Sequence, residues 1–226
     1  MNRLKIFERF MYPILIVLLG YLVFVSRTDL SYFNETYLRE GGPNQWLIFG
    51  TLMFGAFMSW YRAYILKPFR GSLFAFCLVV FGFLFFAYAM EEISWGQSIF
   101  NFPSPDFFRL YNKTGQTNLR NLVVWGIEVN QIVFTLGVKI FATLYFFILP
   151  FAYKKYPDIK YWVNRYAIPL PRYTQFIAYL VLFFITQAMQ SEKNYEVFEF
   201  GFYWILVLMV YNPLNYEVFS RTQLNR

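Results

Sequence analysis

The sequence predicts an all-α fold, a polytopic transmembrane helical bundle, and three observations support this class. Hydrophobic residues make up 58% of the chain and charged residues only 15%, whereas a soluble domain carries about 25% charged residues. Several uncharged apolar stretches are long enough to cross a bilayer of about 30 Å as helices, at about 1.5 Å per residue. The basic residues cluster between these stretches, as they do at the ends of membrane spans. We therefore expect residues 1–226 to form a single integral membrane domain.

Six predicted spans make up this domain. The first follows a basic segment, and because residues 26–29 offer no small-x-small cleavage site, we interpret it as a retained anchor rather than a signal peptide. The second contains Gly50 and Gly55, small residues that allow close helix contact. The predicted spans cover residues 10–25, 45–65, 71–90, 123–149, 173–189 and 200–211. Because the last apolar run is short, five or seven spans remain alternatives.

The distribution of Lys and Arg predicts the orientation of the bundle. Of the 20 basic residues, thirteen lie on one side of the predicted spans and six on the other, with Lys139 inside a span. Because basic loops stay in the cytoplasm, we expect both termini to be cytoplasmic. The net charge of +7 then indicates anionic lipid headgroups on the cytoplasmic side as partners, and no nucleic acid.

Two residue types are scarce, and their scarcity excludes several kinds of chemistry. The chain has no histidine, which excludes Ser-His-Asp catalysis, His-ligated zinc and bis-His haem. Cys77 is the single cysteine, which excludes an internal disulfide and a thiolate metal site. Any bound metal would have to be a hard, oxygen-liganded ion such as Ca²⁺, Mg²⁺ or Na⁺. The sequence identifies no particular metal site and predicts no cofactor.

Two adjacent carboxylates, Glu91 and Glu92, end the third predicted span. Carboxylates at membrane depth are costly and usually functional, so we predict that they form a catalytic or binding site on the outer side. The alternative is that they only mark where the helix meets water. Consecutive helical residues point about 100° apart, so we expect one glutamate to face the bundle and the other to face the headgroups.

The loop after these glutamates contains the predicted substrate-binding residues. Ser104, Pro105 and Asp106 have the pattern of a helix start with Ser as the cap, which predicts a short interfacial helix in this third loop. The chain then returns toward the glutamates, and we expect one of them to contact the 118–121 segment. The predicted ligand-binding side chains are Trp95, which forms a wall, and the polar residues Gln97, Asn118, Arg120 and Asn121.

A second polar pattern lies in the fourth predicted span. Glu128, Gln131, Thr135 and Lys139 recur at helical spacing and would share one face of a helix. Such a stripe either holds neighbouring helices together by hydrogen bonds or lines a polar cavity, and the sequence leaves both open.

The segment 91–97, EEISWGQ, followed by Thr117-Asn118-Leu119 and by Asn121-Leu122, resembles a group of uncharacterised bacterial multi-pass membrane proteins. The resemblance covers about residues 90–122 and implies a location in the bacterial cytoplasmic (inner) membrane, but no known activity. A histidine often stands in that group where this chain has Arg120, so a histidine-based role does not carry over.

Three classes of function fit these patterns. The first is an outward-facing site at Glu91 and Glu92 that binds or processes a lipid-linked or polar headgroup substrate. The second is an accessory subunit of a larger membrane complex, with other membrane proteins as partners. The third is a small cation or proton transporter, in which Glu128, Thr135 and Lys139 continue a polar path inward. Whether the protein is an enzyme stays open, because the sequence has neither a nucleophile–base pair nor a phosphate loop.

Overall fold

In the computed structural model of the chain, residues 3–129 and 137–221 are described. The long helices are α1 (Arg3–Thr28), α3 (Pro43–Arg70), α4 (Ser72–Glu92), α10 (Tyr173–Gln187) and α11 (Asn194–Tyr211). The shorter helical elements are α2 (Leu30–Tyr32), η1 (Phe33–Tyr37), η2 (Ser94–Gly96), α5 (Gln97–Phe100), α6 (Asp106–Tyr111), α7 (Val138–Thr143), η4 (Leu144–Ile148), α8 (Leu149–Lys155), α9 (Pro157–Arg165) and η5 (Tyr216–Phe219). A two-stranded hairpin consists of β1 (Val123–Val124) and β2 (Ile127–Glu128). The prediction of an all-α fold is confirmed.

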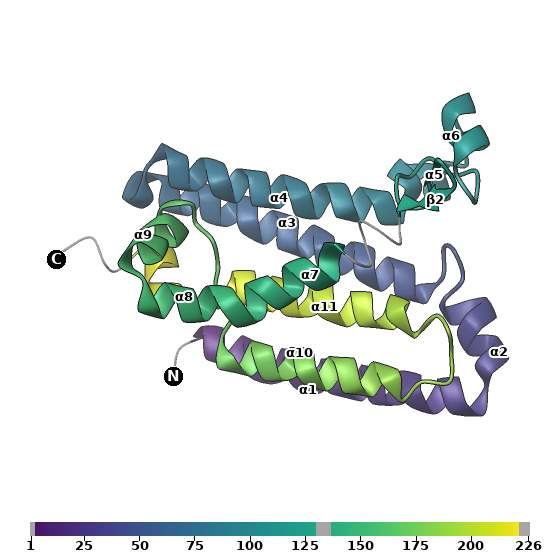
Figure 1. Cartoon of the computed structure of the whole chain (residues 1–226), viewed down its shortest axis with the longest axis horizontal. Coiled ribbons are helices and arrows are strands. Elements are labelled where there is room, and N and C mark those ends of the chain that lie inside the picture. Colours follow the sequence, from purple (N-terminus) through teal and green to yellow (C-terminus); the bar gives the residue numbers. More distant parts are fainter. Residues whose placement is uncertain (1–2, 130–136, 222–226) are drawn as a thin grey trace.

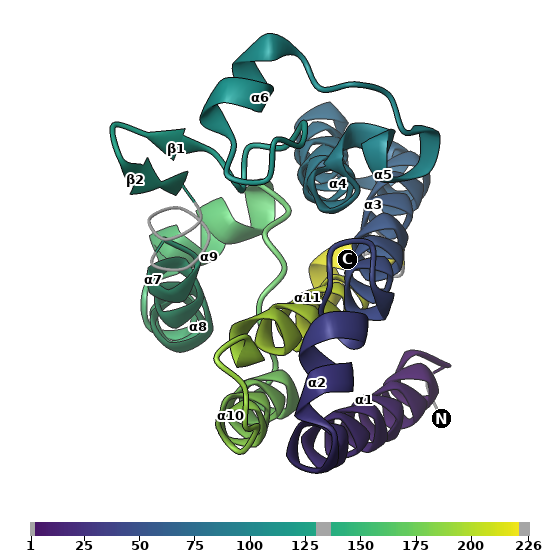
Figure 2. The same cartoon turned by 90° about the vertical axis from the view of Figure 1, so that its right-hand side faces the viewer.

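The long helices run roughly along one axis of the molecule (Figure 1). The loop elements α5, α6 and β2 lie at one end of this axis, which we call the α6 end, and α9 lies at the opposite end, the α9 end. Seen along the axis, α3 and α4 lie beside each other, and α11 lies between them and the pair α1 and α10 (Figure 2). The third loop and the hairpin therefore cover the α6 end of the bundle.

Close packing joins the long helices through small residues. A Cβ atom added at Gly82 of α4 would lie 2.2 Å from the indole nitrogen of Trp60 on α3, and one added at Gly201 of α11 would lie 2.3 Å from Leu182 of α10. Both glycines thus allow a neighbouring helix to approach closely. The buried core between the helices includes Leu22, Phe33, Leu52, Phe200 and Ile205.

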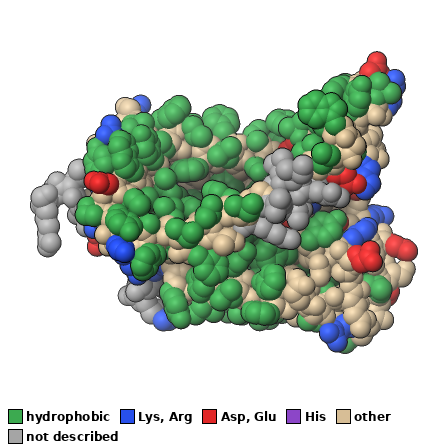
Figure 3. Space-filling view, in the orientation of Figure 1, with side chains coloured by type: hydrophobic (Ala, Val, Ile, Leu, Met, Phe, Trp, Pro, Cys, Tyr) green, Lys and Arg blue, Asp and Glu red, His purple; other side chains and the backbone are tan. Residues whose placement is uncertain are grey.

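The face of the bundle shown in Figure 3 is largely apolar, and charged side chains gather toward its two ends. Large apolar side chains such as Val17, Phe57, Phe76 and Phe83 are exposed. Among the described residues, two helical segments are long and apolar enough to cross a membrane, Phe7–Thr28 and Ser72–Glu92. Six spans and a defined orientation stay predictions.

The fourth predicted span, 123–149, is wrong at its start. Residues 123–128 form the hairpin, in which Val123 pairs with Glu128, because Trp125 and Gly126 adopt positive φ angles of 53° and 76°. This is the backbone of a tight two-residue hairpin turn, and the apolar β-branched residues around it satisfied a hydropathy pattern without being helical. The described helix then runs through α7, η4 and α8 as far as Lys155, with Pro150 in the first turn of α8.

Candidate functional site

The site forms where α4 ends. Helix α4 stops at Glu92, and Ser94, Trp95 and Gly96 follow with positive φ angles of 49°, 55° and 92°. Two of these three residues are not glycine, and left-handed backbone at such positions costs about 1–3 kcal/mol each. The reversal folds the Trp95 side chain back onto the last turn of α4. Strained backbone of this kind is concentrated at functional sites.

Glu91 fastens the third loop to the end of α4. One carboxylate oxygen, Oε1, accepts a hydrogen bond from the Trp95 indole N–H at 2.6 Å. The other, Oε2, accepts the backbone N–H of Leu119 at 2.6 Å and that of Arg120 at 3.4 Å. The side chain is buried, and its contacts place Arg120 directly over the end of the helix.

Glu92 takes part in an ion-pair network that joins three segments of the chain. The Arg120 guanidinium donates to Glu92 at 2.8 Å and to Glu199 of α11 at 2.5 Å. The three side chains are mostly buried, with 5% of Glu92, 17% of Arg120 and 13% of Glu199 exposed. Burial by itself would lower the pKa of Arg120, but the carboxylates of Glu199 and Glu92 raise it above its ordinary value. Arg120 therefore carries a positive charge between two carboxylates.

A further carboxylate, Glu196, lies one turn before Glu199 on the same helix and precedes the predicted span 200–211. Burial raises the pKa of Glu196 to about 7, Arg120 opposes this change, and Glu199 adds to it. Its backbone carbonyl accepts a hydrogen bond from Asn44 at the start of α3 at 3.2 Å. Four glutamates thus surround one arginine, and the site has an excess of negative charge.

Side-chain amides hold the third loop in place around this network. Ser94 Oγ donates to Gln116 Oε1 at 2.7 Å and accepts from Asn118 Nδ2 at 2.9 Å. Gln97 accepts the backbone N–H of Thr117 at 2.8 Å. Gln97, Asn118 and Ser94 are therefore occupied by contacts that shape the loop.

The predicted contact between a glutamate and the 118–121 segment is confirmed, and both glutamates make one. The prediction that one glutamate faces the headgroups is wrong, because the 118–121 segment closes over both, and both are buried.

Two neighbouring residues and the predicted helix start differ in detail from expectation. Trp95 is half-exposed, as a wall would be, but its indole also binds Glu91. Asn121 donates from an exposed position to Thr114 Oγ1 at 3.2 Å. The loop helix α6 begins at Asp106 with Pro105 at the cap position, so Ser104 does not cap it. Instead, the Ser104 hydroxyl accepts a hydrogen bond from Gln97 at 2.8 Å.

The predicted polar stripe of the fourth span is wrong at Glu128. Glu128 lies in strand β2, because the hairpin occupies this stretch, and it pairs with Lys113 at 2.9 Å. It therefore does not share a helix face with Lys139. Gln131, Thr135 and the Lys139 side chain lie outside the described residues.

Glu196 and Glu199 were not among the predicted site residues. Their signal was present in the sequence, since two carboxylates three residues apart at the start of an apolar run share one helix face. A buried polar cluster in the other half of the bundle was not predicted either. There Glu8 of α1 accepts hydrogen bonds from Gln175 at 3.1 Å and from Asn212 at 2.6 Å.

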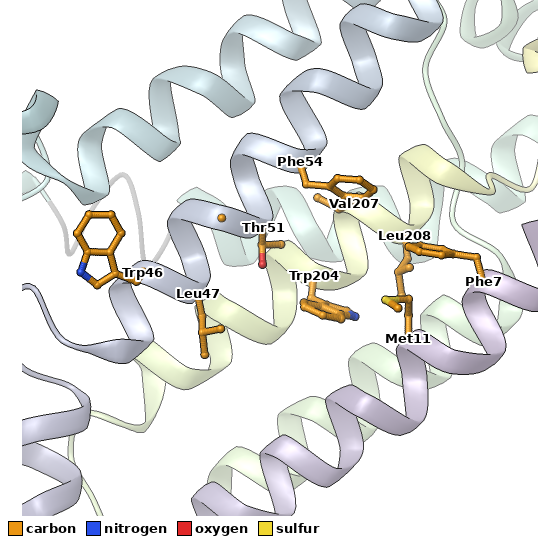
Figure 4. Close-up of a pocket in the computed structure, with 10 residues that line it drawn as sticks. Phe7, Met11, Trp46, Leu47, Thr51, Phe54, Trp204, Val207 and Leu208 are labelled. Atoms are coloured by element: carbon orange, nitrogen blue, oxygen red, sulfur yellow. The ribbon is translucent and has the colours of Figure 1, made fainter.

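The structure has an apolar hollow between the long helices and a polar hollow in the third loop. The apolar one, of about 290 Å³, is lined by residues of α1, α3 and α11, among them Met11, Thr51, Phe54 and Trp204 (Figure 4). The polar one, of about 290 Å³, is lined by Gln97, Asn101, Phe102 and Gln116. Within the described part of the chain, no group of three or more Cys, Asp or Glu side chains is placed to hold a metal ion.

Comparison of the chain with protein-family models, with curated proteins and with solved structures finds no match.

Proposed function

We propose that this chain is a multi-pass protein of the bacterial cytoplasmic membrane, with six spans and cytoplasmic termini. In this proposal, its outward end binds, and processes, the polar headgroup of a lipid or lipid-linked substrate. The ligand-binding groups are Arg120, Glu92, Glu199 and Glu196, and Glu91 positions the loop that carries Arg120. The proposal keeps the site predicted around Glu91 and Glu92 and adds the two carboxylates of α11.

The observation that carries the proposal is the Glu92–Arg120–Glu199 network. A buried ion pair is weak evidence for stability, because removing two charges from water costs about as much as their attraction returns. A network assembled from three distant segments beside a strained loop is therefore better explained by recognition than by stability.

The chemistry of the network suits a headgroup that carries hydroxyl or amine groups. Both terminal nitrogens of the Arg120 guanidinium already donate to Glu92 and Glu199, so the single cation among the described residues of the site is occupied by carboxylates. The surplus carboxylates accept hydrogen bonds from hydroxyl or ammonium groups. Glu196, with a pKa of about 7, is suited to donate or accept a proton near neutral pH.

The test uses Glu196→Gln, because Glu196 is only partly buried and makes no ion pair among the described residues. The matched control is Glu128→Gln, which removes a carboxylate from an exposed pair at the same end. Purified protein in detergent is titrated with short-chain phosphatidylethanolamine, and binding is followed by intrinsic fluorescence. We expect Glu196→Gln to bind about ten- to hundred-fold more weakly, since a hydrogen bond to a charged group contributes about 1.5–3 kcal/mol, and Glu128→Gln to bind like the wild type. Equal binding by all three proteins would contradict the proposal.

A further inference from the structure

A second surface stands out at the α9 end, opposite the ion-pair network (Figure 1). It is the corner formed by residues 153–166, at which α8 ends and α9 begins, and we call it the α8–α9 corner. Its four cations are Lys154, Lys155, Lys160 and Arg165, and all four residues are exposed. Asp158 is its single carboxylate. The corner therefore has a clear surplus of positive charge.

The cations of this corner have no carboxylate partner among the described residues. The ion pairs of the described residues all lie elsewhere: they are Arg109–Asp106, Lys113–Glu128 and the two pairs of Arg120. Three of the four corner cations lie over aromatic rings instead: Lys155 Nζ is 5.4 Å from the Tyr156 ring centre, Lys160 Nζ is 5.9 Å from that of Tyr153, and the Arg165 guanidinium is 5.6 Å from that of Trp162. Their charge is therefore available to an outside anion.

The corner packs against the rest of the chain, and Asn215 Nδ2 donates a hydrogen bond to Asn164 Oδ1 at 3.4 Å. Val163 on the inner face of α9 is buried, and Tyr153 donates a hydrogen bond to Asn164 Oδ1 at 3.1 Å, which joins α8 to α9. The outer face presents aromatic side chains, with 54% of Tyr161 and 47% of Trp162 exposed. Exposed Trp and Tyr beside Lys and Arg are typical of the boundary between a bilayer and water.

The position of the corner agrees with such a boundary. It follows directly on η4 and the start of α8, where Phe147, Ile148 and Phe151 are exposed large apolar residues. An apolar exposed helix that ends in a basic aromatic corner matches a helix that leaves the hydrocarbon layer at its headgroups.

We infer that the α8–α9 corner is a preformed platform that binds the anionic headgroups of the bilayer leaflet at the α9 end. The partner is a phosphate-bearing anionic lipid such as phosphatidylglycerol, recognised by charge and by the aromatic residues at the level of its headgroup. The inference rests on the membrane placement in the proposed function, but it does not depend on the headgroup site at the α6 end.

The experiment measures binding of a fluorescent short-chain phosphatidylglycerol to the full chain in an uncharged detergent, with phosphatidylcholine as the comparison lipid. The corner variant is Lys155→Gln/Lys160→Gln. The matched control, Arg109→Gln/Lys113→Gln, also removes two exposed cations, but these already pair with Asp106 and Glu128. We expect each cation removed from the corner to weaken phosphatidylglycerol binding about five-fold, and the control to bind like the wild type. Added salt weakens the binding of the wild type.

Three results would overturn the inference. These are equal binding of the two lipids, equal loss in the corner variant and the control, and displacement of the lipid by soluble polyglutamate at equal charge, which would indicate an acidic protein partner. Glu196→Gln leaves the corner intact, so it should bind phosphatidylglycerol there like the wild type. Loss of headgroup binding at the α6 end would thus be distinguished from loss of phosphatidylglycerol binding at the α8–α9 corner.

Discussion

Replacing Arg120 by methionine is the sharpest perturbation that the ion-pair network allows. Methionine keeps much of the length of the side chain but leaves Glu92 and Glu199 without their shared cation, although only 5% and 13% of these side chains are exposed. Removing one partner of a buried ion pair costs about 3–5 kcal/mol. For a chain of this size, each kcal/mol corresponds to about 2–4 °C in Tm. We therefore expect Arg120→Met to lower the apparent Tm by about 6–20 °C.

Glu92→Gln is the milder change and serves as the comparison. The glutamine keeps an oxygen that accepts from Arg120, and Arg120 keeps its contact with Glu199. The loss is then at most that of one charge-assisted hydrogen bond, about 1.5–3 kcal/mol. We expect Glu92→Gln to have a higher Tm than Arg120→Met. This order of the two Tm values, more than either value alone, tests whether Arg120 neutralises both carboxylates.

A triple variant separates charge balance from packing. Glu92→Gln/Arg120→Met/Glu199→Gln removes every charge of the network, and uncharged replacements of a buried ion pair are often neutral or stabilising. We expect it to recover most of the stability that Arg120→Met loses, measured by thermal unfolding in detergent followed by tryptophan fluorescence. A triple variant no more stable than Arg120→Met, or Arg120→Met with the Tm of the wild type, would refute this reasoning.

Three further predictions use other parts of the chain. Gly82→Ala places a Cβ atom 2.2 Å from Trp60 and should lower the free energy of unfolding by about 1–3 kcal/mol. Gly50→Ala, which has no neighbour within 4 Å, should raise the Tm slightly. If Gly82→Ala had the higher Tm of the two, the helix packing would be contradicted. Burial raises the pKa of Glu196 from 4.5 to about 7. Between these two pH values the folded state keeps a proton that the unfolded state has lost. The contribution of Glu196 to the free energy of unfolding is therefore fully present below about pH 4.5 and is lost as the pH rises through about 7. The Tm of the wild type should therefore fall relative to that of Glu196→Gln over this range, and parallel curves would exclude such a pKa. In a Cys77→Ser background, Lys193→Cys should react with an impermeant thiol reagent from outside the cell and Lys155→Cys should not; labelling of Lys155→Cys would reverse the orientation.

Hydropathy located the long helices well because a helix is a local structure. Five of the six apolar runs lie largely on described helices, and α1 and α3 extend beyond the predicted bounds of 10–25 and 45–65 at both ends. Hydropathy failed at 123–128 because it does not distinguish an apolar strand from an apolar helix. The information there lay in Gly126, whose positive φ helps to close the hairpin.

The candidate site could be predicted only in part, for a reason of sequence distance. The contact between Glu91 and Leu119 joins residues 28 positions apart, within one loop that returns to the helix it left. The contact between Arg120 and Glu199 spans 79 positions and depends on where α11 packs. A pattern read along the chain shows that Glu196 and Glu199 share a helix face, but not which helix end they meet.

The two adjacent glutamates have different tasks, and the end of α4 explains why. Because Ser94 and Trp95 adopt left-handed backbone, the helix stops, and Glu91 gains hydrogen bonds from the Trp95 indole and from the Leu119 backbone. These charge-assisted bonds, at about 1.5–3 kcal/mol each, are large enough to offset the strain of the two residues. Glu91 thereby fixes Arg120 above the helix end. Because Arg120 binds both Glu92 and Glu199, Glu196 on α11 is the carboxylate of this group that makes no ion pair among the described residues, and in the proposed function an incoming headgroup would meet it first.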